Sequence, residues 1–304
     1  MLLGGLALAG CAPERPPLPP PPPAPLLARD VDAIGAELDL VVRVDLARIR
    51  ASLGPEALAG IAERTLQSRS DDPATRQLLV DALERTDVAH IALRPGKRPE
   101  LTDNVLVLRG RFDKLEVDRY RSLPGWLPPE DLGADVRVYD RRRQPGRSEP
   151  ARVYAFSNDR LVFVSAAAID SAERAIERGV HDERLEPPAK GAISLAARPR
   201  ALAASLSEGS RAAARFLAKS ELLQGYADLT PAGLELEVEL RMQDEASARR
   251  TADALGLIAE DALANGIVPK AVAESLDIRA VGEVAVLRVA VPLDLLAALL
   301  QSGR

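Results

Sequence analysis

The stretch Leu234-Glu235-Leu236-Glu237-Val238-Glu239-Leu240 alternates apolar and acidic side chains without a break. Successive side chains of a β-strand point to opposite faces of its sheet, so this pattern predicts a strand with one buried face and one wet face. Residues 226–229 precede it, and the turn Thr230-Pro231-Ala232-Gly233 joins the two segments. A hairpin of an antiparallel sheet is therefore expected here.

The same kind of pattern extends on both sides of this hairpin. Toward the C-terminus, residues 245–263 have helical spacing, residues 276–280 and 284–291 read as strands around Val281-Gly282-Glu283, and residues 293–300 read as a helix. Toward the N-terminus, we expect a strand at 192–197 and helices at 199–206 and 210–223. The order is strand, helix, hairpin, helix, hairpin, helix.

The preceding part of the chain follows a related order. Leu40, Val42 and Val44 alternate with Asp39, Val41 and Arg43, which predicts a strand with one face better buried than the other. The further expected strands are 88–93 paired with 105–111, and 152–156 paired with 161–164; the expected helices are 49–53, 56–67, 73–85 and 169–178.

Two short matches connect these parts. Ala51-Ser52-Leu53 recurs as Ala204-Ser205-Leu206, and residues 161–164 match 285–288 in register. We therefore predict an α+β fold of two related halves, residues 38–186 and 187–304, each an antiparallel sheet backed by helices. The body resembles secreted bacterial proteins of unknown function that repeat strand–helix units, and this resemblance transfers no functional residue.

The N-terminus carries a different kind of signal. The apolar residues 1–10 end in Leu8-Ala9-Gly10 before Cys11, the only cysteine. This resembles the lipobox of bacterial lipoproteins, which implies removal of residues 1–10 and acylation of Cys11. No Lys or Arg precedes Cys11, so we expect the export signal to begin upstream. Two or three acyl chains would anchor the protein to a membrane stably.

A Pro-rich linker is expected to follow, with residues 11–37 assigned to the anchor cysteine and linker. Pro19 to Pro23 is an unbroken run that favours polyproline II, a semi-rigid spacer without packed structure. Ala12, rather than Asp, follows Cys11. By resemblance to Gram-negative lipoproteins this favours the outer membrane, with the body facing the periplasm or the surface.

The composition excludes some classes of protein. The formal net charge of -5 argues against a nucleic-acid binder, which normally presents a basic face. One cysteine cannot form an internal disulfide or a thiolate metal cluster, and two histidines are few for a zinc site. We therefore expect no cofactor and no metal. No apolar run reaches the roughly 18 residues of a membrane-spanning helix.

Polar residues in four places were considered as sites. His181-Asp182 resembles the adjacent pair of metal phosphohydrolases but lacks further histidines, and His90 in a strand reads as structural. Gly96-Lys97 lacks the glycines of a phosphate loop. The aspartates lack calcium-loop spacing and read as caps or solvated groups; they are Asp39, Asp45, Asp113 and Asp118. No catalytic residue is predicted.

Two loops are candidates for contact with a partner. Arg141, Arg142 and Arg143 form a basic run that could meet anionic headgroups or polysaccharide, or could be a solvated loop. Trp126, the only tryptophan, follows Leu123-Pro124-Gly125 on a stiffened loop. Its indole either contacts a partner or folds back over the sheet.

The leading hypothesis is a membrane-anchored envelope lipoprotein acting as a non-enzymatic binding or assembly module for a protein or polysaccharide. One alternative is an exported hydrolase that uses Asp or Glu residues. A second alternative is a cytoplasmic protein whose apolar N-terminus is fortuitous. A pocket of converging carboxylates would favour the hydrolase, whereas an exposed apolar or Trp126-centred patch would favour the binding module.

Overall fold

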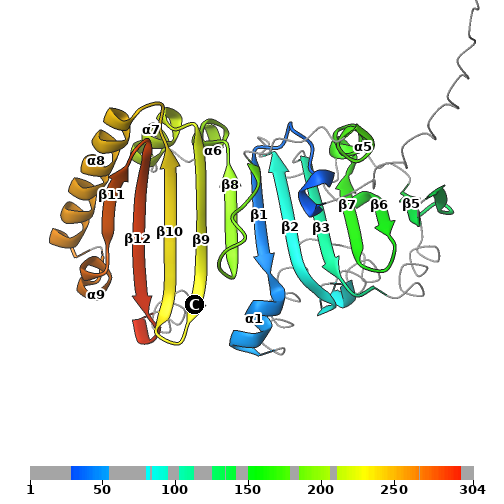
Figure 1. Cartoon of the computed structure of the whole chain (residues 1–304), viewed down its shortest axis with the longest axis horizontal. Helices are drawn as coiled ribbons and strands as arrows, with labels where there is room; N and C mark the ends of the chain where they lie inside the picture. Colours follow the sequence, from blue (N-terminus) through cyan, green and yellow to red (C-terminus); the bar gives the residue numbers. More distant parts are fainter. Residues whose placement is uncertain are drawn as a thin grey trace, which may run out of the picture.

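A computed structural model describes residues 29–54, 80–82, 84–94, 103–112, 125–133, 135–141, 150–178, 185–205, 211–266 and 268–295. Over these residues the chain forms one 12-stranded sheet in which all neighbouring strands are antiparallel (Figure 1). Helices lie against both faces of the sheet. The α+β fold class expected from the sequence is confirmed.

The elements before residue 186 build one end of the sheet. In chain order they are η1 (Asp30–Ala33), β1 (Leu40–Asp45), α1 (Leu46–Leu53), β2 (Thr86–Arg94), β3 (Asp103–Gly110), β4 (Glu130–Gly133), β5 (Val136–Asp140), β6 (Pro150–Phe156), β7 (Arg160–Ser165), η4 (Ala166–Ala168) and α5 (Ile169–Arg178).

The elements after residue 186 build the other end. They are β8 (Ile193–Ala197), α6 (Pro199–Ser205), α7 (Arg211–Lys219), β9 (Leu222–Thr230), β10 (Gly233–Arg241), α8 (Glu245–Ala264), α9 (Lys270–Glu274), β11 (Asp277–Val281) and β12 (Val284–Pro292).

The two sets of strands join into a single sheet, where the sequence suggested one sheet for each half. The strand order is β11-β12-β10-β9-β8-β1-β2-β3-β7-β6-β5-β4. The junction is the antiparallel pair of β1 and β8, with Val42 opposite Leu195. Pairing satisfies the backbone groups that each strand would otherwise leave exposed as a sheet edge. A duplication behind the two halves stays a prediction.

The connections on either side of this junction follow a similar order. Reading outward from the junction, β1, β2, β3, β7 and β6 lie on one side, and β8, β9, β10, β12 and β11 on the other. The same sequence spacing separates Val42 from Leu195 at the centre of the ladder and Ala51 from Ala204 in the repeated tripeptide. β5 and β4 follow β6 and end the sheet on the side of the first set.

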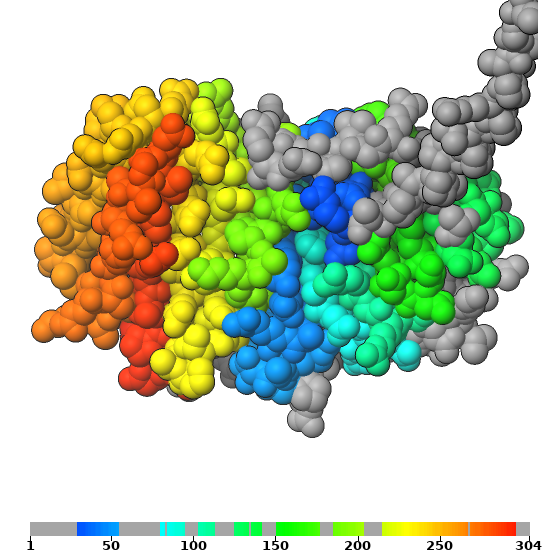
Figure 2. All heavy atoms as spheres, in the orientation of Figure 1, coloured from blue at the N-terminus to red at the C-terminus, as the bar shows by residue number. Residues whose placement is uncertain are grey.

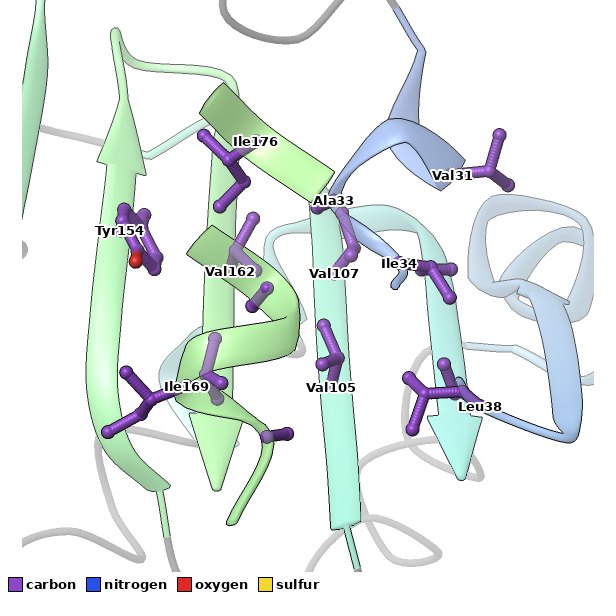
Figure 3. Close-up of a cluster of buried hydrophobic side chains, with 14 of the residues drawn as sticks. Val31, Ala33, Ile34, Leu38, Val105, Val107, Tyr154, Val162, Ile169 and Ile176 are labelled. Atoms are coloured by element: carbon purple, nitrogen blue, oxygen red, sulfur yellow. The ribbon is translucent and has the colours of Figure 1, made fainter. Parts of the chain in front are cut away.

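We call the sheet face that carries α5 and η1 the front face; it is toward the viewer in Figure 1. Over the strands of the first set, this face forms a continuous apolar core. Val105, Val107 and Val162 of the sheet pack beneath Ile169 and Ile176 of α5 (Figure 3). Val31, Ile34 and Leu38 from the start of the described chain complete this core.

The back face of the first set is also covered. Leu108, Tyr139 and Phe163 project from the strands, and Leu46 and Trp126 pack against them. Tyr139 and Leu108 are completely buried. The first set of strands is therefore enclosed between two apolar layers.

The second set of strands has a core on its back face. There Leu240 and Ala285 pack against Ala248 and Ala252 of α8. On the front face the same strands carry mostly polar side chains, and Figure 2 shows their atoms on the surface facing the viewer. This unequal covering of the front face places the polar groups described next.

Candidate functional site

A row of polar side chains crosses the front face of the sheet. Direct cross-strand pairing aligns one residue from each of the adjacent strands between β11 and β2. In strand order they are Asp277, Arg288, Glu237, Tyr226, Ser194, Arg43 and His90. Because directly opposed side chains lie about 5 Å apart, the row is continuous.

At one end of the row a buried charge cluster forms around Asp30. Its carboxylate is 7% exposed and lies 3.0 Å from Arg160 Nε, 3.5 Å from Arg109 Nε and 3.7 Å from His90 Nδ1. Arg43, opposite His90, pairs with Asp45 at 2.9 Å. These side chains come from η1 and from four adjacent strands, and we call them the Asp30 cluster.

His90 is held neutral in this cluster. Its pKa is lowered from 6.5 to about 4, chiefly by burial; Asp30 raises the pKa, and the guanidinium groups of Arg43, Arg109 and Arg160 lower it. Neither His90 Nδ1 nor Arg43 Nη1 makes a hydrogen bond within the part of the chain that the structure describes. The cluster therefore holds buried polar atoms whose hydrogen bonding its carboxylates do not complete.

The low pKa of His90 predicts a pH dependence of stability. In the unfolded chain the imidazole takes up a proton below about pH 6.5, whereas in the folded chain it does so only near pH 4. Stability is therefore lost as the pH falls from 6.5 to 4. We expect the urea-unfolding midpoint of His90→Gln to change less between pH 6.5 and 4.5 than that of the parent. His181→Gln, which changes the other histidine, is the control; an equal reduction there would contradict the assignment.

A second cluster lies farther along the row, around Glu237. This carboxylate is 7% exposed and is contacted by Arg288 Nε and by Lys190 Nζ, the latter at 3.6 Å. Lys190 also lies 4.0 Å above the centre of the Tyr226 ring, and the Tyr226 hydroxyl is 3.4 Å from Glu237 Oε2. The hydrogen bond with Tyr226 and the charge of Glu237 raise the pKa of Lys190.

Between the two clusters, a chain segment is fixed across the row. The Ser194 hydroxyl donates a 2.6 Å hydrogen bond to the carbonyl of Pro188, which holds the segment that carries Lys190 against the sheet. Lys190 and Arg288 remain about half exposed, so the Glu237 cluster is open to solvent. The Asp30 cluster lies deeper, beneath η1.

Residues 29–38, which we call the N-terminal segment, are packed onto the sheet. The sequence analysis assigned residues 29–37 to the linker. Val31, Ile34 and Leu38 are buried, and Arg94 Nε donates a 2.7 Å hydrogen bond to the carbonyl of Glu37. Hydrogen bonds from Ser171 and Arg174 lower the pKa of Glu37 to about 2. The chain is thus tied down before its first strand.

The candidate residues that the sequence offered fall in different places. His90 belongs to the Asp30 cluster, Asp39 pairs with Arg198 at 3.4 Å, and Asp45 caps α1 by accepting from the amide of Arg48 at 2.9 Å. Of the other candidates, these lie outside the described residues: Cys11, Gly96, Lys97, Asp113, Asp118, Arg142, Arg143, His181 and Asp182.

Trp126 is not on the surface. Its side chain is 9% exposed and belongs to the apolar layer on the back face, and its backbone forms an isolated bridge with Arg141. Of the two interpretations of this indole, the structure shows the one in which it folds over the sheet. Within the described residues the indole therefore offers little surface to a partner.

The sequence analysis missed Asp30, Arg43, Arg109 and Arg160. A signal was available for Arg43, which stands between Val42 and Val44 inside an apolar strand. A charge at such a place needs a partner when the strand is covered. The alternating pattern placed Glu237 on the solvent-facing side of its strand. It lies on that side, but Lys190 and Arg288 bury its carboxylate.

Two kinds of feature are absent from the described residues. No group of three or more His, Cys, Asp or Glu side chains in the described ranges could hold a metal ion. Among the helices that the structure describes, none is long and apolar enough to cross a membrane.

Comparisons with known proteins add little to this site. No protein-family model matches the sequence, and no curated protein matches it. Three solved structures, crystal forms III, IV and I of TP0453, are similar over 90%, 89% and 90% of this chain and 97%, 95% and 96% of theirs, with TM-scores of 0.46, 0.49 and 0.49 and identities of 9%, 10% and 12%. A likeness at this level is too weak to carry an inference about function.

Proposed function

We propose that this protein is a lipid-anchored, non-enzymatic binding or assembly module of the bacterial cell envelope, attached through Cys11 and favouring the outer membrane. The observation that carries the proposal is the N-terminal segment. Chain termini usually fray unless they are tied down, and here residues 29–38 are held by buried apolar groups and by the Asp30 cluster. A linker that ends at residue 28 would therefore join the folded body at a fixed position.

The anchor is tested by the mass of the protein in a membrane. The full chain, preceded by a complete export signal, is expressed in a Gram-negative host and recovered from the envelope. We expect an N-terminus at Cys11 that carries acyl mass, and Cys11→Ala should lose this mass and become soluble. Ala12→Asp, the matched variant, should keep the lipid but move to the inner membrane. Wild-type protein that is soluble and unmodified would refute the proposal.

The binding surface in this proposal is the front face of β9, β10, β12 and β11. It is exposed in Figure 2, and its side chains include charged, amide and hydroxyl groups. Arg279, Arg288 and Lys190 are each about half exposed there. A face of this kind suits a partner recognised by hydrogen bonds and charge, such as a polar protein surface or a polysaccharide.

The surface is tested by photo-crosslinking in the host envelope. A photoreactive amino acid in place of Arg279, on the front face of β11, is expected to give a discrete adduct. The same amino acid in place of Lys270, which is exposed on α9, is the control and should give none. Equal labelling at both positions, or no labelling at 279, would contradict a partner on this face.

A further inference from the structure

Arg109 and Arg160 form a like-charged pair that needs an anion. They are direct cross-strand partners on β3 and β7. Like charges directly opposite one another destabilise a sheet. Here a single carboxylate lies against both, with Asp30 Oδ1 3.0 Å from Arg160 Nε and Asp30 Oδ2 3.5 Å from Arg109 Nε. Two guanidinium groups around one anion are typical of carboxylate and phosphate recognition.

The groups around Asp30 offer more hydrogen bonding than its carboxylate uses. His90 is more than nine-tenths buried, and its Nδ1 faces Asp30 Oδ2 at 3.7 Å, too far for a hydrogen bond. In the described part of the chain Asp30 Oδ1 makes no hydrogen bond either, so the carboxylate is poorly matched to the groups around it. A tetrahedral phosphate has more acceptor oxygens than a carboxylate and reaches in more directions, so it fits this set of groups better.

The site also has a route to solvent and an exchangeable occupant. Arg109 is half exposed, whereas Arg160 is 13% exposed, so the site opens on the Arg109 side. Asp30 belongs to η1, a single short turn at the start of the described chain. Because Asp30 is part of the same chain, its effective concentration is high, and an external anion must displace η1 to bind.

We propose that Arg109, Arg160 and His90 form a phosphate-binding site whose resident occupant is the chain's own Asp30, so that an external phosphate group competes with docking of residues 29–34. The site couples the attachment of the N-terminal segment to the presence of a phosphate anion. This goes beyond the proposed envelope function and does not depend on lipidation. It is therefore tested on the unlipidated full chain carrying Cys11→Ala.

The first measurement is hydrogen exchange of the amides of residues 29–38. Inorganic phosphate is titrated at constant ionic strength against chloride. We expect phosphate to speed exchange in this segment severalfold while the amides of β9 and β10 are unchanged. Asp32→Asn, in the same turn but paired with Arg29, should respond as the parent does. Unchanged exchange in residues 29–38 would overturn the proposal.

The second measurement uses a variant in which the Asp30 carboxylate no longer occupies the site. Asp30→Asn should bind phosphate directly, so phosphate should raise its thermal midpoint more than that of Asp32→Asn. If Asp30→Asn does not fold, Arg109→Gln, whose side chain is half exposed, should fold and abolish the phosphate effect on exchange. Equal thermal shifts in both aspartate variants, or a phosphate effect that survives Arg109→Gln, would overturn the proposal.

One further experiment distinguishes a lipid headgroup from a free anion as the source of the phosphate group. Phosphatidylglycerol vesicles are compared with inorganic phosphate in the same exchange experiment. Faster exchange with both indicates that a lipid headgroup reaches the site, and faster exchange with inorganic phosphate alone indicates a free anion. An absence of effect from both would overturn the proposal.

Discussion

Asp30→Asn is expected to lower the free energy of unfolding by about 3–5 kcal/mol, the usual cost of removing one partner from a buried ion pair. Arg160 is 13% exposed, so without the carboxylate its charge would stay in a poorly solvated place beside Arg109. Arg109 is half exposed and adds little to the loss. The measurement is urea unfolding of the full chain at pH 7, followed by circular dichroism.

The matched control is Asp32→Asn. Asp32 lies in the same turn, is 14% exposed and pairs with Arg29, which is 43% exposed; it also accepts a hydrogen bond from the Arg29 amide, which the Asn side-chain oxygen can still accept. We expect a loss of about 1 kcal/mol or less, as for surface ion pairs. A loss in Asp30→Asn no larger than in this control would mean that the cluster does not clamp the N-terminal segment.

The sequence predicts strands best where one face of the sheet is buried and the other is not. Residues 234–240 alternate without interruption and lie inside β10. The predicted helix at 210–223 extends too far, because α7 ends at Lys219 and β9 begins at Leu222. Leu223 lies seven residues after Phe216 and Leu222 four residues after Ala218, so helical periodicity alone does not reveal the end of the helix. Ser220 marks it, with its hydroxyl bonded to the carbonyl of Leu217.

The Asp30 cluster was beyond the reach of the sequence because it depends on strand order. β7 pairs with β3, and β4, β5 and β6 lie outside that pair, so Arg160 comes to face Arg109 across a large separation in sequence. Hairpin patterns predict neighbours along the chain and do not predict such a crossover. Asp30 follows a Pro-rich stretch, and composition alone assigned it to the linker.

The polar row has different surroundings at its two ends. His90, Arg109 and Arg160 lie where η1 covers the front face, and the two arginines pair there with Asp30 of the chain's own segment. Glu237 and Arg288 sit where no helix of the described chain covers that face, so their partners stay open to solvent. The two ends of the row differ in whether η1 covers them, and not in the types of residue they contain. The covered end holds the N-terminal segment, and the uncovered end is the candidate binding surface.

Trp126→Ala is expected to lower the free energy of unfolding by about 3–5 kcal/mol, as for large aromatic residues in a core. The indole is 9% exposed and lies in the same apolar layer as Tyr139 and Phe163 on the back face. A tryptophan that served as a surface contact would instead lose little stability, because exposed side chains make few internal contacts. Urea unfolding of the purified variant measures the difference.

Leu132→Ala provides the comparison for Trp126, because Leu132 lies on β4 at the same end of the sheet and is 48% exposed. Its truncation should cost about 0.5 kcal/mol or less. If both variants lost equally little, the indole would not be part of the core, and a contact role at this loop would be open again. A large loss in Trp126→Ala alone means that the apolar layer behind the first set of strands needs this ring.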